Sequence, residues 1–240
     1  MIRKIALSAL AIAPAIVLVL HLAPRGNAQA PADSISGKVF FNGTRPTVRN
    51  ISMDANITCA KLHPNGVPSQ EVLLNSDNSL RNALVYVKAG TGIAGKQFPA
   101  PTEAIKIDQK GCMFEPHVVA AMTSQRIEIA NADPSNHNVH VMSEVNPIFN
   151  VSQVPQAPPK VAQFAKPELG LVLMCNIHPW MRVYVNVMSN PYYAITGADG
   201  SFTIKGLPPG LYTLEAWHEK YGSQEKKARV GGKADFTFVE

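Results

Sequence analysis

Four side chains of this sequence could together hold one metal ion. Cys175, His178 and Met181 follow one another at three-residue intervals, and His137 lies about forty residues upstream. Two imidazoles, one thiolate and a weak thioether suit a copper ion that cycles between Cu(I) and Cu(II), because the sulfur ligands hold the soft Cu(I) state while imidazole holds both states. The residue types and their order therefore predict one mononuclear copper site.

Strands on both sides of the Cys-His-Met segment are needed to bring the distant histidine to it. Residues 126–131 alternate polar and apolar side chains, as a half-buried strand does, and His137 follows after a loop rich in Asn, Asp and Pro. An apolar run at 169–174 leads into the segment, and the strand-like run 183–187 follows it. We therefore expect a rigid sheet to fix both ends of the segment.

The spacing of these residues resembles that of the cupredoxins, the small blue-copper proteins that include plastocyanin and amicyanin. The resemblance covers roughly residues 98–190, and the short Cys-x2-His-x2-Met loop with an upstream His-Asn is most similar to amicyanin. It implies a Greek-key β-sandwich in which Asn138 hydrogen-bonds across to the ligand loop, a contact that orients ligands and tunes the potential. Asn138 and Asn176 are the residues expected to surround the ligands. The implied equatorial ligands are His137, Cys175 and His178, and the implied axial ligand is Met181.

The C-terminal quarter carries a second pattern. Asp199-Gly200 separates two strand-like runs, and the turn 208–210 precedes alternating apolar residues that begin at Tyr212, which is typical of β-hairpins. This pattern resembles the last strands of the carboxypeptidase regulatory-like (transthyretin-like) β-sandwich. Its opening strands resemble residues 37–46 and 83–87.

The copper segment thus falls between two halves of another module. Because the termini of a domain often lie close together, an insertion into a surface loop is tolerated. We therefore predict an all-β protein in which a Greek-key cupredoxin sandwich, residues 97–190, is inserted in a discontinuous carboxypeptidase regulatory-like β-sandwich, residues 34–96 plus 191–240. Residues 50–80 depart from the carboxypeptidase regulatory-like pattern and are expected to form an additional segment. Two tandem, incomplete domains are the alternative.

The N-terminus has the features of a secretory signal. Arg3 and Lys4 precede an apolar run at 5–20, and Ala28-Gln29-Ala30 fits a cleavage site. We expect residues 1–30 to be removed and the protein to be periplasmic or extracellular. An uncleaved anchor is the competing interpretation and would be the only source of membrane contact, but the run is 16 residues long and short for a span.

The charge of the chain gives no sign of a nucleic-acid partner. The formal net charge is +5 over 240 residues. Loss of residues 1–30 would leave 19 basic residues against 17 acidic ones, and this balance lacks the excess of basic side chains that binds phosphate backbones.

Three cysteines are present, and the copper site uses one of them. In an oxidising compartment the remaining pair, Cys59 and Cys112, favours a disulfide. The alternative is a second soft-metal or copper-loading site in which His63 and His117 join these two cysteines.

A copper ion held by four protein ligands has no open position for a substrate, so we expect one-electron transfer rather than an enzyme. The expected partner is a redox protein, namely a dehydrogenase, a cytochrome or an oxidase. Electrons are expected to enter at His178 and Trp180, with the imidazole edge of His178 reaching the surface through an apolar rim. The alternatives are a copper-binding protein for metal delivery or storage, and a scaffold or binding module in which copper is structural.

Overall fold

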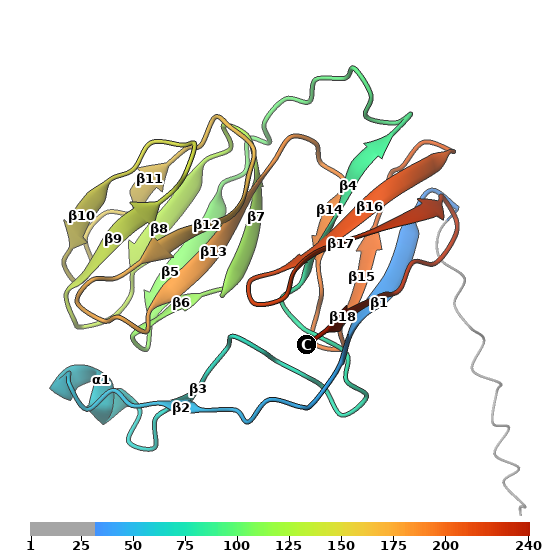
Figure 1. Ribbon diagram of the computed structural model, residues 1–240. Coiled ribbons are helices and arrows are strands. Elements are labelled where there is room, and N and C mark those ends of the chain that lie inside the picture. Colours follow the sequence, from blue (N-terminus) through green and yellow to red (C-terminus); the bar gives the residue numbers. More distant parts are fainter. Residues whose placement is uncertain (1–31) are drawn as a thin grey trace, which may run out of the picture.

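The computed structural model describes residues 32–240, in which eighteen strands and one short helix confirm the predicted all-β class (Figure 1). The signal segment predicted at residues 1–30 lies outside this range. Within the described range, no helix is long and apolar enough to cross a membrane.

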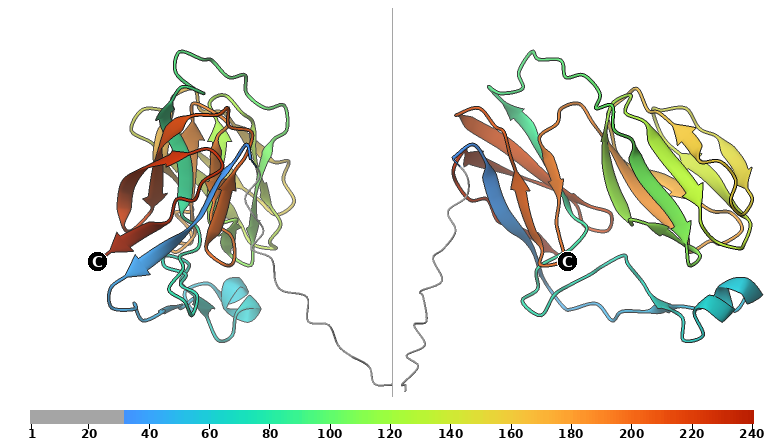
Figure 2. Two further views of the ribbon diagram at one scale, coloured as in Figure 1. Left: turned by 90° about the vertical axis from the view of Figure 1, so that its right-hand side faces the viewer. Right: turned by 180° about the vertical axis from the view of Figure 1, so that it is seen from behind.

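Two β-sandwiches lie side by side in the views of Figures 1 and 2. The first, here called the outer sandwich, is built from both ends of the described chain. Its sheets have the strand orders β15-β1-β18 and β14-β4-β16-β17. The strands are β1 (Ile35–Asn42), β4 (Leu84–Gly90), β14 (Tyr193–Ile195), β15 (Ser201–Ile204), β16 (Leu211–His218), β17 (Gly222–Arg229) and β18 (Phe236–Val239).

The second, here called the inner sandwich, is built from the chain between β4 and β14. A five-stranded sheet, β10-β9-β12-β13-β7, faces a four-stranded sheet, β11-β8-β5-β6. The strands are β5 (Ile105–Lys110), β6 (Met113–Glu115), β7 (Val118–Met122), β8 (Ile127–Asn131), β9 (His137–Met142), β10 (Asn150–Gln153), β11 (Lys160–Ala162), β12 (Glu168–Met174) and β13 (Arg182–Met188).

Alternating burial explains why these segments form sheets around separate cores. In β8, Ile127 and Ile129 are buried while Glu128 between them is half-buried, because side chains of a strand point to opposite faces in turn. They join a core of the inner sandwich to which β5, β9, β12 and β13 also contribute. A second core, with Phe236 and Phe238 of β18, fills the outer sandwich.

Strand β7 is buried on both faces and ties the two sandwiches together. Val119 and Ala121 pack into the inner core. Ala120 and Met122 point the other way, into a third cluster that includes Leu84 of β4. All five residues of β7 are therefore apolar and buried, whereas a strand with one solvated face would alternate.

A long excursion leaves the outer sandwich after β1 and runs along the inner sandwich. Residues 43–78, here called the strap, contain β2 (Asn50–Ile51), α1 (Ile57–Leu62) and β3 (Val67–Pro68). Figure 1 shows the strap passing beneath both sandwiches and placing α1 at the far end of the inner one. The chain rejoins the outer sandwich at Ser79, which bridges to Phe40.

Candidate metal centre

The ends of three neighbouring strands bring the predicted ligands together. His137 is the first residue of β9, Cys175 directly follows β12, and Met181 directly precedes β13. Since β9, β12 and β13 are adjacent and antiparallel in one sheet, these three ends lie at the same edge. The sheet therefore brings the distant His137 to the segment that carries Cys175 and Met181.

Backbone hydrogen bonds close the ligand loop. The N–H of Cys175 donates to the carbonyl of Met181 at 3.1 Å, and the N–H of Met181 donates to the carbonyl of His178 at 2.9 Å. The loop is thus a tight turn between two paired strands, and it holds His178 over the end of the sheet.

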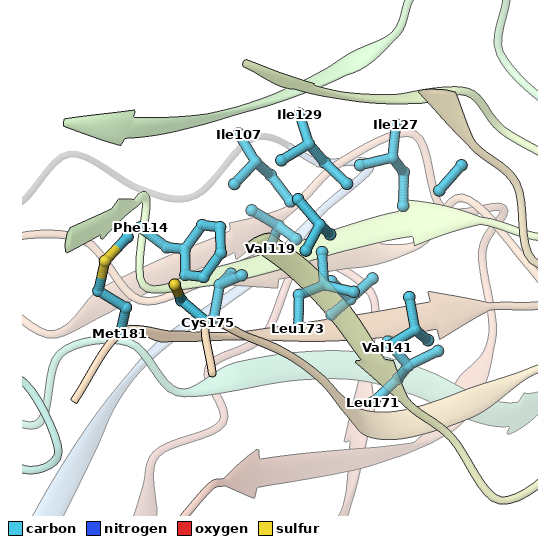
Figure 3. Packing of buried hydrophobic residues seen from close by; sticks show 14 of the residues in the cluster. Ile107, Phe114, Val119, Ile127, Ile129, Val141, Leu171, Leu173, Cys175 and Met181 are labelled. Carbon is cyan, nitrogen blue, oxygen red and sulfur yellow. The ribbon is translucent and has the colours of Figure 1, made fainter. Parts of the chain in front are cut away.

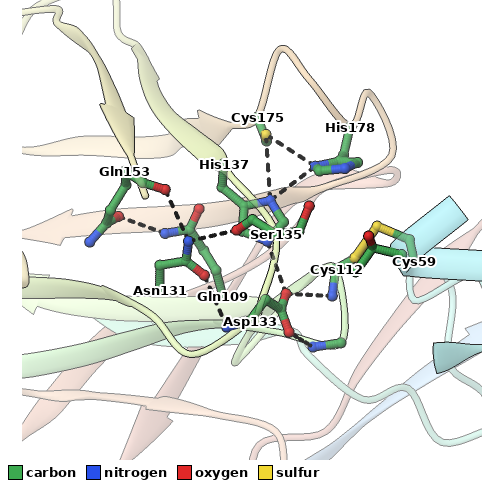
Figure 4. Close-up of polar contacts among 12 residues, drawn as sticks. Cys59, Gln109, Cys112, Asn131, Asp133, Ser135, His137, Gln153, Cys175 and His178 are labelled. Carbon is green, nitrogen blue, oxygen red and sulfur yellow. Dashed lines mark hydrogen bonds and ion pairs between the residues drawn. A yellow bond between two sulfur atoms is a disulfide. The ribbon is translucent and has the colours of Figure 1, made fainter. Parts of the chain in front are cut away.

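Three donor atoms converge on one point. The Cys175 Sγ lies 3.6 Å from His178 Nδ1 and 4.0 Å from His137 Nδ1, and the two Nδ1 atoms are 2.9 Å apart (Figure 4). Each of these side chains is 0% exposed, and Cys175 is the free cysteine of the chain. Two imidazole nitrogens and one thiol facing one another in a dry pocket fit a soft metal ion.

Met181 belongs to the same buried core as Cys175 and is also 0% exposed. Figure 3 draws both sulfur-bearing side chains at one end of this core, with Phe114 beside them. The fourth predicted ligand is therefore at the correct end of the sandwich.

The outer nitrogen of His137 is held by a carboxylate. His137 Nε2 lies 2.9 Å from Asp133 Oδ2, and the same carboxylate accepts the backbone N–H of Gly111 at 2.6 Å and of Cys112 at 2.7 Å. A carboxylate accepts, so His137 carries its proton on Nε2 and offers Nδ1 to the thiol. Burial opposes ionisation, but the hydrogen bonds from His137, Cys112 and Gly111 hold the pKa of Asp133 below its usual value.

The outer nitrogen of His178 is held by the strap. His178 Nε2 lies 2.9 Å from Asn56 Nδ2. Asn56 also caps α1, because its Oδ1 accepts the N–H of Thr58 at 3.0 Å and of Cys59 at 3.1 Å. The expectation that the edge of His178 reaches the surface is therefore wrong: α1 covers it, and the side chain is 0% exposed.

Asn138 links its own strand to the ligand loop. Its side-chain Oδ1 accepts the N–H of Asn176 at 2.7 Å, so the cross-link implied by the cupredoxin resemblance is present. Its backbone N–H points at the Cys175 Sγ from 3.5 Å. The Asn176 side chain turns outward to His140 Nδ1 at 3.0 Å, which keeps His140 away from the centre.

A disulfide joins Cys59 of the strap to Cys112 of the inner sandwich, the pairing that the sequence favoured. The sulfurs lie within 4.8 Å of a His178 nitrogen, and Cys112 is as close to the Asp133 and His137 donor atoms. Because both sulfurs are bonded to each other, the alternative of a second soft-metal site is wrong. His63 instead contacts the carbonyl of Gly111 at 2.8 Å.

His117 and Trp180 lie beside the centre without joining it. His117 makes a buried side-chain contact with the carboxylate of Glu219, away from the disulfide. The Trp180 ring packs on His178 with 5.3 Å between ring centres, and its Nε1 donates to the carbonyl of Cys112 at 2.9 Å. Trp180 therefore braces the junction of loop and disulfide.

The pocket favours the thiolate of Cys175. Burial alone would raise the pKa of this thiol, but hydrogen bonds from the backbone N–H groups of Asn138, Ile177 and His178 lower it. Burial lowers the pKa of His178. Thiolate and neutral imidazole are the forms that bind a metal.

Sequence reasoning missed the two residues that hold the imidazoles from outside. Asp133 had a local signal, since it lies four residues before His137 in the loop that leads into β9. Asn56 had none, because it is 122 residues from His178 in the sequence. Its role follows only from the path of the strap.

No family model matches the chain, and no curated protein matches it. Solved structures that it resembles include cupredoxins and a copper-containing enzyme. Amicyanin from Paracoccus versutus is 16% identical with a TM-score of 0.32, over 43% of this chain and 97% of its own. A purple cupredoxin from Nitrosopumilus maritimus is 16% identical with a TM-score of 0.31, over 35% of this chain and 99% of its own.

A copper-containing nitrite reductase from Thermus scotoductus is 19% identical with a TM-score of 0.33, over 43% of this chain. The alignment spans 28% of the nitrite reductase chain. At these TM-scores the likenesses carry no argument about chemistry, which has to come from the residues themselves.

Proposed function

We propose that this protein is an exported electron carrier with one mononuclear type 1 copper site. The observation that carries the proposal is the convergence of Cys175 Sγ with the two Nδ1 atoms of His137 and His178 in a sealed pocket. Met181 is the proposed axial ligand. Copper, when bound, would supply a one-electron couple between Cu(I) and Cu(II).

The surrounding residues suit a site whose ligands stay in place during a redox cycle. Asp133 and Asn56 hold the imidazoles from outside, while Asn138 holds the ligand loop against β9. Outer contacts of this kind fix ring orientation and tune the metal. With the ligands buried, water is kept from the centre and there is no open position for a substrate, so we propose that the protein is not an enzyme.

The proposed partner is another redox protein, namely a dehydrogenase, a cytochrome or an oxidase, in the periplasm or outside the cell. Metal delivery or storage would require ready exchange of the ion. The strap opposes such exchange because a disulfide ties it down over His178.

The assignment of the outer sandwich to the carboxypeptidase regulatory-like family is likewise a proposal, carried by its turn pattern.

Replacing the thiolate tests the site directly. The copper-loaded protein should absorb strongly in the visible range through charge transfer from the Cys175 thiolate, and Cys175→Ser should abolish that band. Met181→Leu serves as the matched control: it should keep the band and raise the potential, since it removes only the weak axial donor. Visible spectra with metal analysis make the measurement, and a Cys175→Ser protein that stays coloured would contradict the proposed site.

A further inference from the structure

The side chain of Asn56 faces two kinds of partner at once. One end lies 3.0 Å and 3.1 Å from the backbone nitrogens of Thr58 and Cys59. Backbone N–H groups only donate, so that end must be the amide oxygen. The end that faces His178 is therefore the NH2 group, which also only donates.

This assignment fixes the proton of His178. An acceptor is needed at Nε2, so the proton of the neutral imidazole must sit on Nδ1, which lies 2.9 Å from the unprotonated Nδ1 of His137. His137 in turn donates from Nε2 to Asp133. Asp133, His137, His178, Asn56 and the first turn of α1 thus form one continuous chain of hydrogen bonds in which every donor has an acceptor.

Metal ligation by His178 breaks this chain at one place only. A ligating Nδ1 must give up its proton, and the neutral ring then carries the proton on Nε2. That Nε2–H would point at the NH2 group of Asn56, and two donors would face each other in a buried site. His137 meets no such conflict, because its Nε2–H already faces an acceptor in Asp133.

We propose that Asn56 couples the occupancy of the metal centre to the strap. When His178 ligates, the amide of Asn56 turns over, presents its oxygen to His178 Nε2–H and gives up the cap of α1. The N–H groups of Thr58 and Cys59 then lose their acceptor, and the first turn of α1 loosens while the disulfide keeps the strap attached. This inference rests on the proposed function, since it requires that His178 holds the metal through Nδ1.

Amide hydrogen exchange measured by NMR tests the coupling on the protein with its disulfide intact, once metal-free and once loaded with diamagnetic Cu(I). The amides of Thr58 and Cys59 should exchange about tenfold faster in the loaded protein, the effect of losing one hydrogen bond of ordinary strength. The amides of Gly111 and Cys112 are the matched control: they donate to Asp133, which accepts in both states, so their rates should not change.

Two substitutions separate the coupling from a merely structural role. Asn56→Asp supplies two acceptor oxygens, so it can cap α1 and accept from His178 Nε2–H together. It should abolish the change at Thr58 and Cys59, slow copper release to a chelator about tenfold, and lower the potential because a carboxylate favours Cu(II). Asn56→Ser keeps a cap acceptor but cannot reach His178, so it should abolish the change without slowing release.

The outcomes are distinguishable from a failure of the proposed function. If the wild-type protein binds copper, as its visible band would show, and the exchange of Thr58 and Cys59 is the same with and without metal, the coupling is overturned. Release and potential that are equal in Asn56→Asp and Asn56→Ser would overturn it as well. If the wild-type protein takes up no copper, the proposed function fails first, and the coupling fails with it.

Discussion

The two imidazoles of the centre are held by different regions of the molecule. His137 is oriented from within the inner sandwich, by a carboxylate four residues away on the loop that leads into its own strand. His178 is oriented by a neutral amide on the strap, which leaves and rejoins the outer sandwich. The carboxylate that holds His137 is local and charged, and it accepts a hydrogen bond whether or not metal is bound. The amide that holds His178 depends on long-range packing and fits only one tautomer of the imidazole. The two imidazoles should therefore respond differently to the same substitution.

Removing the disulfide should have the largest effect and should fall on the His178 side. Cys59 and Cys112 are 53 residues apart, for which loop entropy gives a stabilisation of about 4 kcal/mol. Cys59→Ser with Cys112→Ser should therefore lower the free energy of unfolding of the metal-free protein by about that amount, as measured by chemical denaturation. It should also speed copper release, because the strap is freed over His178. An unchanged denaturation midpoint would show that the strap is held by packing alone.

His218 offers a comparison with His137, because it is a buried imidazole that is not held by a carboxylate. His218 in the outer sandwich is 1% exposed, and burial, helped by the nearby charges of His117 and Lys220, lowers its pKa from 6.5 to about 4. Between these two pH values the imidazole is protonated in the unfolded chain but not in the folded protein. The free energy of unfolding therefore falls as the pH drops from 6.5 towards 4, by up to about 3 kcal/mol. Urea denaturation of the metal-free protein across this range should show the slope, and His218→Phe should reduce it. Equal slopes in the two proteins would rule out His218 as the source.

Replacing the carboxylate of Asp133 should weaken copper binding through His137 without releasing the strap from His178. Asp133→Asn removes the charge that the Nε2–H of His137 faces, and outer contacts of this kind typically change metal affinity by about 10–100-fold. We expect weaker copper binding and a higher potential, because a negative charge near the centre favours Cu(II). Asp54→Asn, an exposed change on the strap, is the control and should leave both quantities alone. Equal effects of the two changes would contradict the role of Asp133.

The smallest expected effect concerns the brace between the ligand loop and the disulfide. Trp180→Phe keeps an aromatic ring against His178 but removes the Nε1 donor to Cys112. The loss of one neutral hydrogen bond should cost about 1 kcal/mol of unfolding free energy in thermal or chemical denaturation. The visible band should not move. A shifted band would mean that Trp180 sets the ligand geometry itself.

The same division between local and long-range order explains what the sequence could predict. The four predicted ligand positions follow from local pattern, because each lies at the end of an expected strand or at a fixed interval on one short loop. The pairing of Cys59 with Cys112 follows once Cys175 is assigned to the metal. The burial of His178 could not be predicted, since nothing in residues 43–78 indicates that this excursion would travel to the far end of the inner sandwich.

The parallel pairing of β1 with β18 bears on how the chain folds. Val39 lies opposite Phe236, which is far along the sequence, so β1 cannot complete this pairing until β18 has been synthesised. Contacts of such long sequence separation form late, after loop closure has become favourable through other pairings. The inner sandwich can pair its strands as soon as residue 188 is available, whereas β1 keeps an unpaired edge until Phe236–Val239 are available. A chain that ends before Phe236 would leave this edge open and uncover the outer core, and unpaired edges of this kind are sites of aggregation.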